Sequence, residues 1–216
     1  TTLDRSFPAE EQLALMAAHE HVVLGSDQTL QIVTRDRPGL FARVAGALAL
    51  CDLSIVDAQI HVTGTKALEV LQVADAYEED NPVDWERAVE LVEEVLGNSD
   101  DLTSRFEARE RSILRRSVQA PQPIETVRVD FDNEVSEVST VIEVAGPDRL
   151  GLLYEVSSTI VAAGLDTQQA RVQTVGGDVV DSFYVQTLDG AKFTEAEAQE
   201  ALRAALAASR LPGLAL

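Results

Sequence analysis

The sequence predicts an α+β fold made of two ferredoxin-like βαββαβ units in tandem, each an antiparallel sheet with its helices on one face. The first observation is an internal repeat: residues 36–41 read Asp-Arg-Pro-Gly-Leu-Phe, and 112 residues later 148–153 read Asp-Arg-Leu-Gly-Leu-Leu. The following stretch aligns at this offset without a gap, placing Ala58 on Ala170 and Val73 on Val185. The second observation is the order strand, helix, strand, strand, helix in each copy, which one further strand completes to the ferredoxin-like arrangement.

Length and composition are consistent with this architecture. A chain of 216 residues has room for two small domains, and 45% hydrophobic with 25% charged residues is a globular balance. The sequence holds no apolar run long enough for a membrane span and no signal peptide. Its formal charge of −20 argues against nucleic acid as a partner. Cys51, the single cysteine, is expected to fill the core, and we expect a cytoplasmic protein.

The predicted organisation is an N-terminal helical linker (1–28), a first domain (29–98), a connecting helix and linker (99–124) and a second domain (125–216). Because the sequence begins without methionine, we expect a fragment of a longer protein. Residues 126–131 alternate cleanly between polar and apolar and predict a strand. This strand could complete either the first or the second unit.

The elements of the first copy follow from hydrophobic periodicity and turn residues. Pro38 stands near a helix start, where its missing N–H costs nothing, and Gly64-Thr65 predicts a hairpin turn. The first copy is therefore expected to contain a strand at 29–34, a helix from 38 to 51, strands at 53–63 and 67–74, and a helix at 83–96.

A charged helix and a linker are expected between the copies. Residues 101–118 mix acidic and basic side chains with a few apolar ones, which indicates a helix with a solvated or interdomain face. Two prolines within 120–123 end it. The second copy is expected to contain a strand at 139–145, a helix at 150–163, strands at 165–174 and 179–188, and a helix at 195–209, followed by a short tail at 211–216.

The repeated loop has a chemistry of its own. Gly39 and Gly151 leave the backbone uncovered at a helix start, where the first N–H groups lack partners within the helix. Such a start is a ready site for a carboxylate, which every free amino acid carries. Asp36 and Asp148 could cap their own helices or pair with the ammonium group of a ligand.

Catalytic constellations are not found in the sequence. The three histidines, His19, His21 and His61, include no His-Asp dipeptide, and no Gly-rich phosphate loop opens a helix. We therefore expect no catalytic residues, metal ligands or cofactor in this chain. Whether the protein to which it belongs is an enzyme is left open by these residues alone.

The repeated units resemble ACT domains, small modules that bind amino acids in regulated proteins. More narrowly, the pair resembles the C-terminal region of the PII nucleotidyltransferases, bifunctional uridylyltransferase and uridylyl-removing enzymes. The resemblance covers residues 27–208 and is carried by 36–41, 44–49, 55–60 and 148–154, and by 181–192, where an aromatic strand runs into Leu-Asp-Gly-Ala-Lys. One departure is Leu150, where the family has proline.

This resemblance implies a regulatory module that senses glutamine and controls the modification and demodification of the PII protein in nitrogen metabolism. It implies as partners L-glutamine or another amino acid, N-terminal catalytic domains of the same protein, and the PII protein. It implies magnesium only in those catalytic domains. Edge strands of such sheets are often closed by side-by-side pairing, so a second copy of the chain is a further expected partner. In ACT domains the second strand adds ligand contacts. The ligand-binding residues expected on both grounds are Asp36, Arg37, Pro38, Gly39, Leu40, Asp57, Gln59, Asp148, Arg149, Gly151, Leu152, Gln169 and Arg171.

Two other functions are compatible with the sequence. One is a stand-alone tandem interaction protein whose loops bind nothing. The other is the regulatory end of an amino-acid biosynthetic enzyme. Glutamine binding and the sequence upstream of Thr1 would separate these possibilities.

Overall fold

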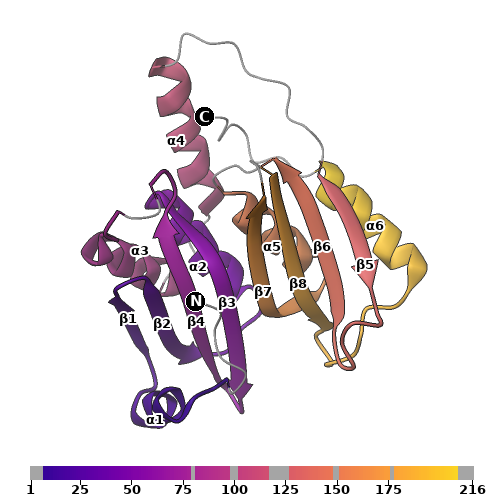
Figure 1. Cartoon of the computed structure of the whole chain (residues 1–216), viewed down its shortest axis with the longest axis horizontal. Helices are drawn as coiled ribbons and strands as arrows, with labels where there is room; N and C mark the ends of the chain where they lie inside the picture. The colour runs from indigo at the N-terminus through magenta and orange to yellow at the C-terminus, as the bar shows by residue number, and fades with distance from the viewer. Residues whose placement is uncertain are drawn as a thin grey trace.

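The computed structural model describes residues 7–78, 81–97, 102–116, 127–147, 151–175 and 178–208. Their strands form one continuous antiparallel sheet of eight strands in the order β1-β2-β4-β3-β7-β8-β6-β5 (Figure 1). The strands are β1 (Val22–Ser26), β2 (Thr29–Arg35), β3 (Leu53–Thr63), β4 (Lys66–Asp75), β5 (Arg128–Asp132), β6 (Thr140–Pro147), β7 (Leu165–Val175) and β8 (Asp178–Thr187).

Helices cover one face of this sheet, and one further helix lies on the other. Alternate residues of a strand point to opposite faces. Ile32 in β2 accordingly belongs to the main core beneath the helices, whereas Val33 packs with Met16 of the N-terminal helix on the reverse face. The helices are α1 (Glu10–Ala18), α2 (Leu40–Leu50), α3 (Trp85–Gly97), α4 (Leu102–Arg116), α5 (Leu152–Ala162) and α6 (Ala196–Ala208). The predicted fold class, two ferredoxin-like units with helices on one face plus an N-terminal and a connecting helix, is confirmed.

The two units meet at a local two-fold axis. In the centre of the sheet β3 pairs with β7 through Ala58 opposite Ala170, and these are equivalent residues of the repeat. Asp57 lies opposite Arg171, and Gln59 opposite Gln169, as a two-fold axis through the alanine pair requires. On the helical face α2 packs against α5 across the same boundary between the units, which we call the seam.

The N-terminal segment differs from the predicted helical linker. Helix α1 ends at Ala18, and β1 then forms a hairpin with β2 through Asp27, whose φ is 50°. The prediction missed β1 because this strand is short and depends on a distant residue. The ring of Trp85 occupies the space where a Cβ on Gly25 would lie, and its Nε1 donates to the carbonyl oxygen of Asp27 at 3.0 Å.

The strand predicted at 126–131 completes the second unit. It is β5, and it pairs along its length with β6. In the first unit β1 has the corresponding edge position beside β2. Each unit therefore reads ββαββα, with the additional strand before the repeated βαββα pattern rather than after it. The expected turn glycines 176–177, the linker at 120–123 and the tail at 211–216 lie outside the described residues.

The remaining predictions of elements agree with the structure to within a few residues. The connecting helix is α4, and Leu102 and Phe106 anchor it in the main core. Cys51 is buried as expected, and burial raises the pKa of its thiol. Among the described helices none is long and apolar enough to cross a membrane.

Candidate functional site

Each repeated loop lies at the seam, against the helix and the strand start of the other unit. Gly151, Leu152 and Tyr154 of the second unit face Ala45 and Ala49 of α2 across a cleft of about 420 Å³. Gly39, Leu40 and Phe41 of the first unit face Ser157 and Val161 of α5 across a cavity of about 10 Å³. Because the linings correspond at the 112-residue offset, these are two versions of one site, the Gly151 cleft and the Gly39 cavity.

The glycines are required by the backbone. Gly39 and Gly151 immediately precede α2 and α5 and have φ of 80° and 84°, a left-handed conformation that favours glycine. Both helices begin on the residue after the glycine, so their first N–H groups face the seam.

Helix capping by the aspartate side chain was one of two possibilities for Asp36. In the structure no side-chain hydrogen bond caps α2, and the Asp36 backbone N–H donates to the carbonyl of Thr65 at 2.8 Å.

Substitutions between the repeats account for the difference in volume. Where the Gly151 cleft has Ala49, the Gly39 cavity has Val161, and a Cβ on Gly39 would lie 3.3 Å from Cγ1 of that valine. The first unit's loop is therefore packed directly onto α5. The second unit's loop faces the smaller alanine side chains of α2, which leaves an open cleft.

The two sites also differ in the residues at the strand start that lines each of them. Thr167 and Asp166, at the start of β7, line the Gly39 cavity, and their equivalents Ile55 and Ser54, at the start of β3, line the Gly151 cleft. At this position the wall of the Gly39 cavity is therefore polar and acidic, whereas that of the Gly151 cleft carries an isoleucine beside a serine.

A buried carboxyl lies beneath each loop at the same position of the repeat. Glu69 in β4 is 1% exposed, and Asp181 in β8 is 2% exposed. Burial, followed by the charges of Asp166 and Asp36, raises the pKa of Glu69 to about 8. Sequence analysis missed both residues because each stands in an apolar strand. The signal that could have found them is their coincidence at the repeat offset.

Arg37 of the first loop and Arg43 of α2 both contact the end of α3. Nη2 of Arg37 donates to the carbonyl oxygen of Leu96, and Nη1 of Arg43 reaches that of Val95 at 3.5 Å. These carbonyls belong to the last turn of α3, where cations are favourable. Burial, with the neighbouring charge of Arg43, lowers the pKa of Arg37. Arg37 thus holds α3 against the loop, although its position also borders the cavity.

The predicted strand residues lie elsewhere. Ala58 and Ala170 point into the core beneath the helices, so their neighbours Asp57, Gln59 and Gln169 point to the opposite face of the sheet, as does Arg171. The structure therefore brings these four together at the two-fold axis but separates them from Gly39 and Gly151. Pro38 is not among the residues that line either site, and Asp148 and Arg149 lie outside the described residues.

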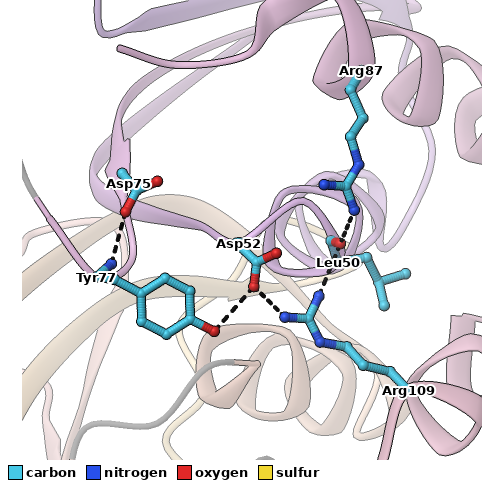
Figure 2. A network of polar contacts seen from close by, with 6 residues as sticks. All are labelled: Leu50, Asp52, Asp75, Tyr77, Arg87 and Arg109. Atoms are coloured by element: carbon cyan, nitrogen blue, oxygen red, sulfur yellow. Dashed lines mark hydrogen bonds and ion pairs between the residues drawn. The ribbon is translucent and has the colours of Figure 1, made fainter. Parts of the chain in front are cut away.

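A network of polar contacts connects α3 and α4 to one wall of the Gly151 cleft (Figure 2). The carbonyl oxygen of Leu50, at the end of α2, accepts hydrogen bonds from Arg87 of α3 at 3.1 Å and from Arg109 of α4 at 3.0 Å. Arg109 also pairs with Asp52, which accepts a hydrogen bond from the Tyr77 hydroxyl at 3.1 Å. Two residues before this tyrosine, Asp75 lines the cleft and accepts from the Tyr77 N–H at 3.0 Å. The connecting helix is thereby joined to a wall of the cleft.

Sequence comparison relates the chain to one group of proteins. It is 39% identical over 188 residues to the bifunctional uridylyltransferase/uridylyl-removing enzyme of Gluconobacter oxydans, a match that covers 83% of this chain and 19% of the relative. The enzyme of the same name from Cereibacter sphaeroides is 36% identical over 172 residues, covering 77% of this chain and 18% of the relative. The chain thus spans about a fifth of the length of the curated relatives it matches. No family model matches the chain.

Similarity to solved structures is distant. An aspartate kinase from Synechocystis matches over 75% of this chain and 25% of its own, with 16% identity and a TM-score of 0.37. The regulatory subunit of aspartate kinase from Thermus thermophilus matches over 88% of this chain and 99% of its own, with 14% identity and a TM-score of 0.23. These scores are too low to carry an argument about fold or ligand.

Proposed function

The chain is homologous to a region of the bifunctional uridylyltransferase/uridylyl-removing enzymes, and we propose that this region is a regulatory module that senses L-glutamine. The observation that carries the proposal is the Gly151 cleft, a cavity at the seam between two repeated units with a helix start in its wall. Its volume of about 420 Å³ is in the range typical of small-molecule sites.

The lining of the cleft suits an amino acid. The first N–H groups of α5 offer hydrogen bonds and a favourable dipole to an α-carboxylate. Asp181 adds a carboxyl to the wall for an α-ammonium group, and Ala45, Ala49 and Leu152 supply an apolar surface for the methylene groups of the side chain. Ser54 and Asp75 add polar groups to the lining that could receive a side-chain amide.

A ligand in this cleft contacts both units at once. The α5 start belongs to the second unit, whereas Ser54 and Ala49 belong to the first. Binding would therefore favour the arrangement of the units in which both sets of contacts are made. Coupling to catalytic domains in the same protein, and through them to modification of the PII protein, requires that those domains distinguish this arrangement from others.

Titration calorimetry of the chain with L-glutamine tests the proposal. We expect saturable heat with glutamine and at least tenfold weaker binding of L-glutamate, whose side-chain carboxylate would lie beside Asp75. Ser54→Phe fills the cleft from the start of β3 and should abolish binding. Val135→Phe is the matched control, because Val135 is 64% exposed and lines neither site.

Two outcomes would count against the proposal. Equal binding by wild type and Ser54→Phe would move the ligand away from the Gly151 cleft. No heat with glutamine, together with an unchanged melting temperature in its presence, would favour an interaction module whose loops bind nothing.

A further inference from the structure

Three carboxylates from separate parts of the chain converge on the Gly39 cavity. Asp36 follows β2, Glu69 lies in β4, and Asp166 lies at the start of β7 in the other unit. They are close enough for the charges of Asp166 and Asp36 to act on Glu69, and for that of Asp36 to act on Asp166. The remaining cavity is about 10 Å³, which is roughly the space for a single water-sized particle.

Polar groups aimed into this space lack partners. Oε2 of Glu69 has no hydrogen-bond partner among the described residues, and neither has Oγ1 of Thr167, which is 5% exposed. The carboxylate of Asp166 accepts hydrogen bonds from Nε2 of Gln168, at 3.0 Å to Oδ2, and from the backbone N–H of Thr167. Arg37, which also lines the cavity, donates to the carbonyl oxygen of Leu96. A buried acceptor without a donor costs free energy, and so does a buried charge without a counter-charge.

We propose that the Gly39 cavity binds a small monovalent cation that donates hydrogen bonds, the ammonium ion, with Glu69 and Thr167 as two of its acceptors. This site is distinct from the Gly151 cleft and does not depend on the proposed glutamine binding. The four N–H bonds of ammonium match a wall in which carboxylate and hydroxyl oxygens come from several directions. A divalent ion such as magnesium retains several waters, for which this cavity has no room.

The same chemistry could be supplied by the ammonium group of an amino acid. A whole amino acid exceeds the volume of the cavity, which favours the free ion. Methylammonium and glutamine therefore serve as separate arms of the test. Potassium has a similar charge and size but donates no hydrogen bonds, so it tests whether hydrogen-bond donation is required.

Thermal unfolding of the chain at pH 8 tests this site at constant ionic strength in ammonium, methylammonium, potassium, sodium or tetramethylammonium chloride. At ammonium concentrations well above the dissociation constant we expect a melting temperature about 3–5 °C higher than in the other salts. Glu69→Gln and Thr167→Val should each remove this increment. Glu143→Gln, which neutralises an exposed strand carboxylate, should retain it.

Several results would overturn the proposal. Equal stabilisation by potassium would mean that the cavity selects for charge and size alone. An ammonium increment that persists in Glu69→Gln would place the effect elsewhere. Stabilisation by glutamine, but not by ammonium, that disappears in Glu69→Gln would assign the cavity to the amino group of an amino acid. Glutamine calorimetry on Glu69→Gln keeps the two proposals apart, because the Gly151 cleft is unchanged in that variant.

Discussion

Glu69 is the residue whose position is least expected from its chemistry. It stands in an otherwise apolar stretch of β4, between Leu68 and Val70, and its side chain is inaccessible to solvent. Burial and two neighbouring carboxylates both disfavour its ionised form. Ionisation of Glu69 would therefore place an unfavourable charge at the seam between the units.

Stability should depend on pH through Glu69. The pKa of this carboxyl is raised to about 8 in the folded chain from its ordinary value of 4.5, so the folded state holds an additional proton between these values. The free energy of unfolding should then fall by about 1.4 kcal/mol per pH unit as pH rises through this window, and level off above it. Glu69→Gln should remove this contribution, so it should match wild type below pH 4.5 and exceed it at pH 8.

Urea unfolding of wild type and Glu69→Gln at a series of pH values measures the difference in their free energies of unfolding. Contributions from the other titrating groups cancel in this difference. Glu143→Gln is the control and should show no such pH-dependent difference. A constant difference between Glu69→Gln and wild type from pH 4 to pH 9 would contradict the assignment.

At the scale of elements, the connecting helix α4 packs in the main core. Phe106 is 1% exposed and stacks on Tyr154 of α5, with ring centroids 4.9 Å apart. Arg105 pairs with Glu94 of α3, and Arg109 pairs with Asp52 after α2. One helix outside the repeat thus contacts three helices. The charge-rich pattern predicted a solvated or interdomain face, and these contacts with both units correspond to the second alternative.

The junction of α2, α4 and α5 depends on Gly46. A Cβ at this position would lie 2.7 Å from Cδ1 of Leu102 and 2.8 Å from Cδ2 of Tyr154. In an open helix, Gly→Ala stabilises by about 1 kcal/mol. Here we expect Gly46→Ala to destabilise by about 1–3 kcal/mol, because the packed side chains of Leu102 and Tyr154 must shift. Chemical denaturation measures this change.

Gly97→Ala is the matched control, since no atom lies within 4 Å of a Cβ built on this residue at the end of α3. It should leave stability unchanged or raise it by up to about 1 kcal/mol. If Gly46→Ala proved as stable as wild type, the close packing of α4 on α2 would be refuted.

At the scale of the molecule, the seam is narrow in the sheet and is reinforced by helices. The β3–β7 pairing comprises three residue pairs, whereas β3 and β4 pair along nearly their whole length. Packing of α2 on α5 adds the rest of the contact between the units. Both candidate sites lie along this seam, so the relative position of the units determines the shape of each.

The two units should unfold as one cooperative body. We expect a single calorimetric transition for the described architecture, because the core is continuous across the seam. Ala170→Asp places a carboxylate at a 1% exposed position on the two-fold axis and should separate the transition into two. Differential scanning calorimetry measures this separation.

Arg171→Ala changes the adjacent, exposed residue and serves as the control, which should keep one transition. Two transitions in wild type would show that the units fold independently and that the seam contributes little.

Hydrophobic periodicity and turn residues determined most of the fold. They predicted both βαββα repeats, the charged connecting helix and the loops at Gly39 and Gly151, because each of these depends on residues close together in the sequence. They missed β1, whose hairpin depends on Trp85 of a distant helix. They also left open which unit β5 completes, because pairing of strands is not encoded within a single strand.

The sequence by itself determined that there are two loops of one kind, each with glycine before a helix. Only the tertiary structure decided that these loops face each other's units across a two-fold axis, and that the resulting sites differ. Asp57, Gln59, Gln169 and Arg171 lie on the opposite face of the sheet from the loops, while Glu69, Asp166 and Asp181, which the sequence did not single out, line the sites. The physical reason is that volume and charge at a seam depend on residues from both units. A change as small as Ala49 to Val161 between the copies closes one site and leaves the other open.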